Sequence, residues 1–188
     1  MARPKSEDKR VAILDAATRT IAAHGLGVAT AAIAKEAGVS NGSLFTYFDT
    51  KADLFNQLYL ELKKEMAAAA MGGLPSGDDT RGQLQHMWNG WLGWAGAHPA
   101  KRRALAQLSV SEEIEPATHQ AAGQGMAGVA EILEKSRSGG PMQDAPLAFV
   151  SALASALVDA AIDYIIRDPD NADTHARTSF DALWRMIA

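Results

Sequence analysis

The sequence contains no cysteine, and aromatic residues make up only 6% of its 188 residues. Without thiols the chain can form no disulfide, zinc–thiolate site, iron–sulfur cluster or cysteine nucleophile, so packing alone holds its scaffold. A reducing cytoplasm suits such a chain best. Asp15 and Arg19 interrupt the apolar run near the start, which leaves no secretory signal in the first 30 residues. We therefore expect a cytoplasmic protein.

Runs that alternate β-branched or aromatic residues with polar ones, typical of strands, are also missing. The many alanines favour helix, because alanine has the best helix propensity. Division of the length by about 150 residues per domain allows one or two compact units. The sequence therefore predicts an all-α fold of about nine helices.

Charge is divided unevenly along a chain whose formal net charge is −4. Residues 1–64 carry nine Lys or Arg against seven acids, whereas residues 65–188 carry nine against fifteen. A mildly basic N-terminal part suits contact with a polyanion, because binding depends on the local potential more than on the total charge. A surplus of two positive charges is small, so charge alone neither predicts nor excludes a nucleic-acid partner.

Capping residues and the spacing of apolar positions predict where the helices begin and end. Thr50-x-x-Asp53 is an acidic variant of the capping box, which marks the start of a long helix to Ala70. Glycines and a proline at 72–77 then break the chain. The other helices are expected at 6–24 after a Ser6 cap, 31–37 after Thr30, 41–48 after Ser40, from Asp78, Asp79 or Thr80 to 98, 100–109, 116–135, 145–167 after Asp144 and 174–186 after Asp173.

Residues 29–54 describe two short helices separated by a turn with glycine, the pattern of a helix-turn-helix whose second helix enters the DNA major groove. Ala34 is small where the helices cross, and Gly38 can adopt the positive φ of the turn. The inward apolar positions are Ile33, Ala37, Val39 and Leu44. A helical hairpin that only packs is the alternative.

Short polar groups occupy the front of the second helix and suit base edges and phosphates. These are Ser40, Asn41, Ser43 and Thr46, with Gly42 permitting close backbone approach and Tyr47 and Lys51 as further donors.

At these residues the sequence resembles the TetR family of transcriptional regulators. The match comprises Val11-Ala12-Ile13-Leu14-x-Ala16-Ala17, Gly25, Thr30, Ile33-Ala34, Ala37-Gly38-Val39-Ser40, Gly42-x-Leu44-Phe45-x-Tyr47-Phe48, Lys51 and Leu54. The resemblance implies a homodimer that binds palindromic operator DNA and a small-molecule effector. It also implies a DNA-binding domain at 1–50, a connecting helix at 51–71 and a ligand-binding and dimerisation domain over 51–188.

The resemblance assigns roles to single positions. It implies phosphate contacts for Thr30, Ser40, Tyr47 and Lys51, positions at or near base edges for Asn41, Gly42, Ser43, Phe45 and Thr46, and minor-groove contacts for Arg3 and Lys5. Phe45 stands where tyrosine is usual, which favours an apolar contact such as a thymine methyl. Asn41 is neutral where lysine or arginine is frequent, which favours adenine and weakens the phosphate contribution.

Residues 145–167 form a helix that is apolar nearly all round, and such a helix needs a large core or a partner chain. Its length approaches a membrane span, but Asp159 and Asp163 lie in a polar stripe that lipid would disfavour. We therefore predict burial by dimerisation and no membrane. The expected interface residues are Phe149, Leu153, Ala156 and Leu157 on this helix and Phe180, Leu183 and Trp184 on the last.

Three of the four tryptophans fall within seven residues, as Trp88, Trp91 and Trp94 on one broad helix face. They either pack in the core or line an apolar effector cavity, to which Met87, His119 and Met126 would contribute. Asp159 and Asp163 could instead recognise a cation, or they are solvated carboxylates.

Gly123-Gln124-Gly125-Met126-Ala127-Gly128 matches G-x-G-x-x-G, but no strand precedes it, so we interpret its glycines as helix contacts or a kink. The five histidines are scattered, and there is no nucleophile motif or P-loop. We expect no catalytic residue, metal or cofactor. A small-molecule carrier that does not use DNA stays open as an alternative, supported by the acidic charge and by Asn41.

Overall fold

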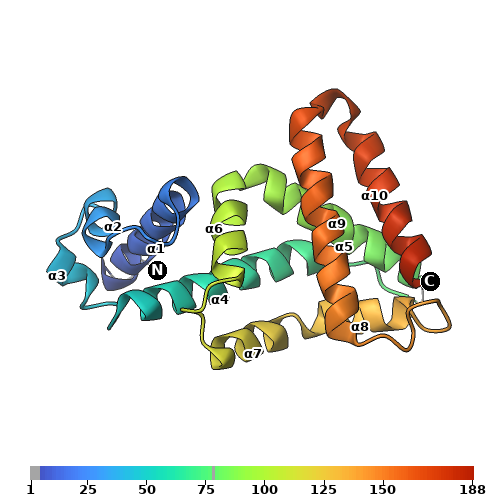
Figure 1. Cartoon of the computed structure of the whole chain (residues 1–188), viewed down its shortest axis with the longest axis horizontal. Helices are drawn as coiled ribbons and strands as arrows, with labels where there is room; N and C mark the ends of the chain where they lie inside the picture. The colour runs from blue at the N-terminus through green and yellow to red at the C-terminus, as the bar shows by residue number, and fades with distance from the viewer. Residues whose placement is uncertain (1–4, 78) are drawn as a thin grey trace. The chain divides into compact units, whose positions relative to one another are not determined.

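A computed structural model describes residues 5–77 and 79–188, and this part of the chain is helical without strands. The helices are α1 (Lys5–His24), α2 (Thr30–Glu36), α3 (Asn41–Leu44), α4 (Lys51–Met71), α5 (Thr80–Ala97), α6 (Pro99–Ser109), α7 (Pro116–Gly125), α8 (Ala127–Ser136), α9 (Leu147–Arg167), the 3₁₀-helix η1 (Pro169–Asn171) and α10 (Ala172–Ile187) (Figure 1). The all-α prediction is confirmed.

The described part holds ten α-helices where about nine were expected, because the predicted helix at 116–135 is two helices. The break falls at Met126, inside the glycine-rich motif, where the backbone leaves the helical region with ψ near 9°. A Cβ on Gly128 would lie 2.9 Å from the Met71 side chain. Gly125 thus ends α7 beside the break, and Gly128 lies against the end of the Met71 side chain.

Two predicted caps are present as hydrogen bonds. Thr50 Oγ1 accepts from the Asp53 backbone N–H at 3.0 Å, and the Asp53 carboxylate accepts from the Asp49 N–H at 3.0 Å. Ser40 Oγ accepts from the Ser43 N–H at 3.0 Å. Both caps satisfy backbone donors that a helix start leaves without partners.

Four other predicted caps differ from the structure. Helix α1 already begins at Lys5, so Ser6 lies inside it, and Thr30 is the first residue of α2 rather than its cap. Helix α9 begins three residues after Asp144, behind Pro146, whose ring disfavours helical geometry in the residue before it. Asp173 lies inside α10, because the 3₁₀ turn at η1 leads into that helix early.

The chain divides into two compact units. Unit 1 combines Met1–Lys63 with His98–Gly123, and unit 2 combines Lys64–Ala97 with Gln124–Ala188. This differs from the predicted division near residue 50, because α6 and most of α7 belong with the N-terminal helices. The functional domain boundary stays a prediction.

In unit 1, α1 packs against both α2 and α6, and α2 packs against α3. Buried side chains from all these helices and from α4 form its core. They include Ile13, Ile21, Ile33, Leu44, Phe48, Leu54, Phe55, Leu58 and Leu108. The core fixes the angle between α2 and α3.

In unit 2, α5 packs against α8, α9 and α10, and α9 and α10 lie side by side (Figure 1). A Cβ added at Gly90 of α5 would collide with the backbone carbonyl of Ala69 on α4, so these two helices approach as closely as glycine allows. Arg81 pairs with Asp181 at 2.9 Å, which ties the start of α5 to α10.

Helix α9 is long and apolar enough, by length and composition alone, to cross a membrane, a property that it shares with core helices of soluble proteins. It packs against α5, α8 and α10, with Val150, Val158 and Ile162 buried. These contacts use one side of α9 and leave other residues exposed.

Candidate nucleic-acid interface

The turn between α2 and α3 is built by backbone hydrogen bonds around Gly38. The Val39 N–H donates to the Ala34 carbonyl at 2.9 Å, and Gly38 has φ +70°. This left-handed conformation strains residues with a side chain, so the turn favours glycine. Ala34 is 1% exposed at the helix crossing, as predicted from its small size.

Helix α3 is shorter than predicted, ending at Leu44, and residues 45–47 continue it as tighter turns. The Thr46 N–H donates to the Ser43 carbonyl and the Tyr47 N–H to the Leu44 carbonyl, both bonds spanning three residues. We call residues 40–47, which comprise the cap, α3 and these turns, the reading segment.

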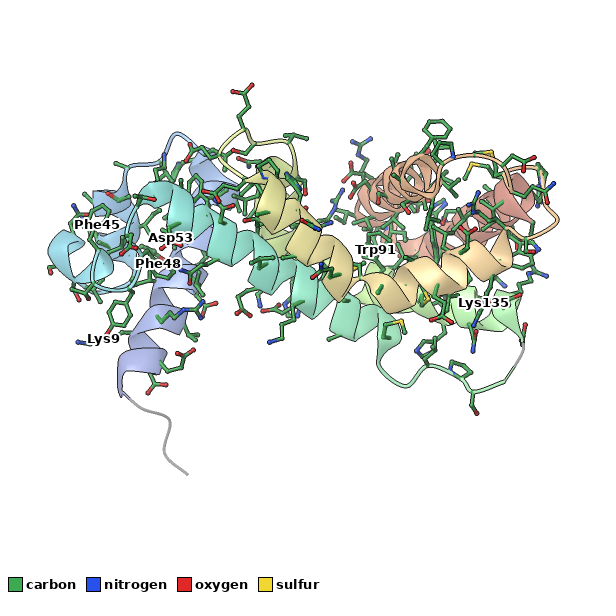
Figure 2. All side chains as sticks on the ribbon, turned by 90° about the horizontal axis from the view of Figure 1, so that it is seen from below. Lys9, Phe45, Phe48, Asp53, Trp91 and Lys135 are labelled. Carbon is green, nitrogen blue, oxygen red and sulfur yellow. The ribbon has the colours of Figure 1, made fainter. Side chains whose placement is uncertain are left out.

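Most side chains of the reading segment face solvent, and Leu44 anchors the segment in the core. Leu44 is fully buried, Phe45 is 40% exposed, and Phe48, just after the segment, is 1% exposed. Phe45 and Phe48 are labelled in Figure 2. Ser40, Asn41, Gly42 and Thr46 are exposed, whereas Ser43 and Tyr47 are partly covered. The structure thus brings the predicted base-edge residues together on one short segment.

The residues predicted to contact DNA outside the reading segment differ in their exposure and in their hydrogen bonds. Lys51 donates from Nζ to the Leu26 carbonyl at 2.7 Å and lies 5.1 Å from the centre of the Phe55 ring, so it also stabilises the loop before α2. Thr30 is partly exposed at the start of α2. Arg3 lies outside the described residues, and Lys5 is described only as the first residue of α1.

Two polar side chains, neither of them predicted as a site residue, link distant parts of unit 1. Gln107 of α6 donates to the Ile21 carbonyl near the end of α1 at 3.2 Å. Buried Asn56 of α4 donates to the Glu113 carbonyl at 2.8 Å and accepts from the Glu115 N–H at 2.9 Å. Their partners lie more than 50 residues away, so no local sequence signal predicts them.

His119, predicted to contact a ligand beside the tryptophans, lies instead in unit 1 against Tyr59 of α4. The Tyr59 hydroxyl and His119 Nδ1 are 3.3 Å apart, and the two rings meet edge to face. Burial raises the pKa of Tyr59 above its ordinary value, and a hydrogen bond with Ser109 acts in the opposite direction.

The tryptophan cluster on α5 belongs to unit 2. Trp91, labelled in Figure 2, is half-buried. Trp88 and Trp94 are buried, and Trp88 packs edge to face on Phe180 of α10. No described residue accepts a hydrogen bond from the indole N–H of Trp88. Met87 is also buried in this unit, and Met126 is half-buried between α7 and α8.

The predicted interface residues fall into two groups. Phe149 is 54% exposed, Ala156 is exposed, and Leu153 and Leu157 are partly covered, so all four of these α9 residues present surface. On α10, Phe180 and Leu183 are each 1% exposed within unit 2 and leave no surface for a partner. Trp184 is half-buried and stacks on Phe180, with ring centres 6.5 Å apart.

Comparison with known proteins places these features in a family. The sequence profile described as "Bacterial regulatory proteins, tetR family" matches residues 13–58, which span α2, α3 and the ends of their neighbours. An HTH-type transcriptional regulator, YhgD of Bacillus subtilis (strain 168), is 36% identical over 66 residues. That alignment covers 35% of each protein, so the match spans about a third of this curated relative.

Solved structures match over nearly the whole chain. A protein of Shewanella sp. PV-4 assigned to the tetR family of transcription regulators is 30% identical, with a TM-score of 0.84, over 94% of this chain and 96% of that one. A TetR family transcription regulator of Marinobacter aquaeolei VT8 shares the fold with a TM-score of 0.88 at 21% identity, over 100% and 99% of the two chains.

Proposed function

This chain belongs to the tetR family of bacterial regulatory proteins, a family of DNA-binding transcription regulators, and we propose that it is a repressor which a small-molecule effector releases from its operator. The observation that carries the proposal is the reading segment, whose polar side chains are exposed on a buried, braced scaffold. Such a surface suits the major groove. The proposed function requires no catalysis, and the protein would carry it out in the cytoplasm.

The proposed DNA contacts follow from the exposure of each side chain. Asn41, Gly42 and Phe45 are exposed and suit base edges, while Tyr47 is partly covered and suits a backbone phosphate. Lys51 would add positive charge near the backbone even while its ammonium bonds Leu26. A carrier that does not use DNA is not favoured, because it would have no need for an exposed reading segment.

We propose a homodimer on a palindromic operator, with α9 at its interface. Phe149, Tyr164 and Ile166 are each more than half exposed, and the exposed Ala156 would permit close approach of a second α9. A two-fold axis would present two reading segments to half-sites about 34–36 Å apart or multiples of that spacing. Trp184 is the one α10 residue of the predicted set with surface left for this interface.

The effector would bind in unit 2 beside the tryptophan cluster. A buried indole N–H without an acceptor costs free energy, which an oxygen acceptor on an apolar ligand would recover at Trp88. Met87, Trp91, Trp94 and Met126 belong to the same unit and stay in the proposal, whereas His119 lies in unit 1. The effector would act through different affinities for two conformations of the dimer.

The proposal is tested with the full chain and DNA fragments that surround its own gene. We expect specific binding whose affinity falls as the salt concentration rises. The Asn41→Ala and Tyr47→Phe substitutions should each lower the affinity further. Lys135→Ala, which removes an exposed charge on α8, is the control and should leave affinity unchanged. Equal binding by all four proteins would contradict the assigned contacts, and absence of specific binding would contradict the proposed function.

A further inference from the structure

The reading segment carries no charged side chain. Between Glu36 and Asp49 the sequence has neither lysine nor arginine, the residues that make the commonest specific contact with guanine in the major groove. The cation that follows, Lys51, is held by the Leu26 carbonyl and lies over the Phe55 ring. Recognition of guanine by a bidentate cation is therefore absent from this segment.

Two hydroxyls of the segment are engaged in local hydrogen bonds. Ser40 Oγ accepts from the Ser43 N–H, and Thr46 Oγ1 donates its single hydrogen to the Ser43 carbonyl at 2.7 Å. These groups position the backbone of α3. The Asn41 amide and the Phe45 ring are the exposed side chains of the segment that no such local hydrogen bond engages.

These two groups match the two bases of one kind of base pair. The amide of asparagine can bond adenine N6 and N7 together, and the apolar feature of a base edge in the major groove is the C5-methyl of thymine. Phe45 is 40% exposed while its neighbour Leu44 is fully buried, so its ring is directed away from the core. It lacks the hydroxyl that would let it bond a polar base edge.

Asn41 and Phe45 also lie on the same side of the helical turn. The Phe45 N–H donates to the Asn41 carbonyl at 3.4 Å, which places the two residues four apart along one turn. Side chains at this spacing are about 5–6 Å apart. One base step in DNA is about 3.4 Å, so the two side chains would reach base pairs one or two steps apart.

We infer that the reading segment selects an A·T-rich half-site, with Phe45 against the methyl group of a thymine and Asn41 on an adenine one or two base pairs away. This inference rests on the proposed function, because it presupposes that the segment enters the major groove. It deepens that function by naming the bases that are read.

The experiment begins with selection by the full chain from a pool of random-sequence DNA duplexes. We expect the selected half-site to contain adjacent A·T pairs. Duplexes are then made in which each thymine in turn is replaced by uracil, which removes only the methyl group. Uracil at one position should weaken binding about fourfold, the effect of losing one buried carbon.

Variants of the protein assign that effect to a side chain. Phe45→Ala should bind more weakly overall and should be indifferent to uracil at the sensitive position, because the methyl group then has no ring to contact. Asn41→Ala should keep the uracil effect. Replacement of adenine by 7-deazaadenine, which lacks the N7 acceptor, should no longer change the affinity of this variant. Phe45→Leu, an apolar replacement, should keep part of the uracil effect.

The outcomes separate the inference from the proposed function. Specific binding with no uracil effect at any thymine, or an equal effect in Phe45→Ala, would overturn the inference and leave the DNA-binding function intact. A selected half-site whose guanines are read through residues 40–47 would also overturn it. Failure to select any sequence would instead contradict the proposed function itself.

Discussion

At the scale of single residues, Asn56 shows how one buried amide organises a loop of unit 1. It is 8% exposed, and its Nδ2 donates to the carbonyls of Ala52 at 2.7 Å and Glu113 at 2.8 Å. Its Oδ1 accepts from the Glu115 N–H at 2.9 Å. The amide therefore satisfies two backbone groups of the loop between α6 and α7.

We predict that Asn56→Ala lowers the free energy of unfolding by about 1–3 kcal/mol, because it leaves partly buried backbone groups without partners. Urea denaturation followed by circular dichroism measures the change. Asn56→Asp retains the acceptor for Glu115 but sets a buried carboxylate oxygen against the carbonyls of Ala52 and Glu113, so its loss should be at least as large. An unchanged midpoint in Asn56→Ala would show that the loop does not depend on this side chain.

Asp168, between α9 and η1, is a second residue with a measurable role. His175 Nε2 lies 2.8 Å from its carboxylate, and Asn171 donates to both of its oxygens at 3.1 Å. These hydrogen bonds, that of His175 above all, hold the pKa of Asp168 below its ordinary 3.8. The folded state thus favours the charged form of this carboxyl.

A lowered pKa in the folded state stabilises the protein above the unfolded pKa, near 3.8, and this stabilisation is lost as the pH falls through the folded pKa. We predict that Asp168→Asn destabilises the protein at neutral pH and that its difference from wild type shrinks below about pH 4. Urea titrations over this pH range measure it. A difference between Asp168→Asn and wild type that stays constant across this range would contradict the role given to the carboxylate.

At the scale of helices, the close approach of α4 and α5 depends on one position. A Cβ at Gly90 would collide with the Ala69 carbonyl and lie 3.1 Å from Ala70 Cα, whereas a Cβ at Gly93, one turn on, meets nothing within 4 Å. The two glycines share a helix and differ only in the face they occupy. They form a matched pair for testing packing against helix propensity.

We predict that Gly90→Ala destabilises the protein by about 1–3 kcal/mol, because backbone cannot move aside as a side chain can. Gly93→Ala should stabilise it by about 0.5–1 kcal/mol, since alanine loses less backbone entropy in a helix than glycine. Both are measured by urea unfolding. Opposite signs confirm the close approach at Gly90, and a stabilising Gly90→Ala would contradict it.

Helix positions were largely predictable from sequence, because capping and apolar spacing are local. Thr50, Asp53 and Ser40 form the caps expected of them. The end of α3 was not predictable, because the same residues can continue as α-helix or as tighter turns. The split at Met126 was also missed, since glycine tolerates both a kink and a break.

At the scale of the whole molecule, the division into units depends on contacts between distant residues. Gln107 reaches Ile21 and Tyr59 reaches His119, and such pairs cannot be inferred from local patterns. The packing of His119 on Tyr59 was missed for this reason. The burial of Phe180 and Leu183 was missed because the apolar face of α10 serves the core of its own unit as well as it would serve a partner.

We predict that Phe149→Asp weakens the proposed dimer, because it places a charge on the exposed apolar side of α9. Light scattering of the purified protein should show loss of dimer, and affinity for a palindromic DNA site should fall by about a hundredfold as two linked contacts become independent. Pro141→Asp, on an exposed loop, is the control. A wild-type protein that is monomeric and binds DNA tightly would contradict the proposal.

The position of the tryptophans has a practical consequence for all these measurements. All four, at 88, 91, 94 and 184, belong to unit 2, whereas unit 1 holds only tyrosines and phenylalanines. Fluorescence excited selectively from tryptophan therefore reports on unit 2 alone, because unit 1 has no tryptophan to emit it. An effector titration and the unfolding of unit 2 can be followed optically without a label, and a single tryptophan introduced into unit 1 would make the two units separately visible.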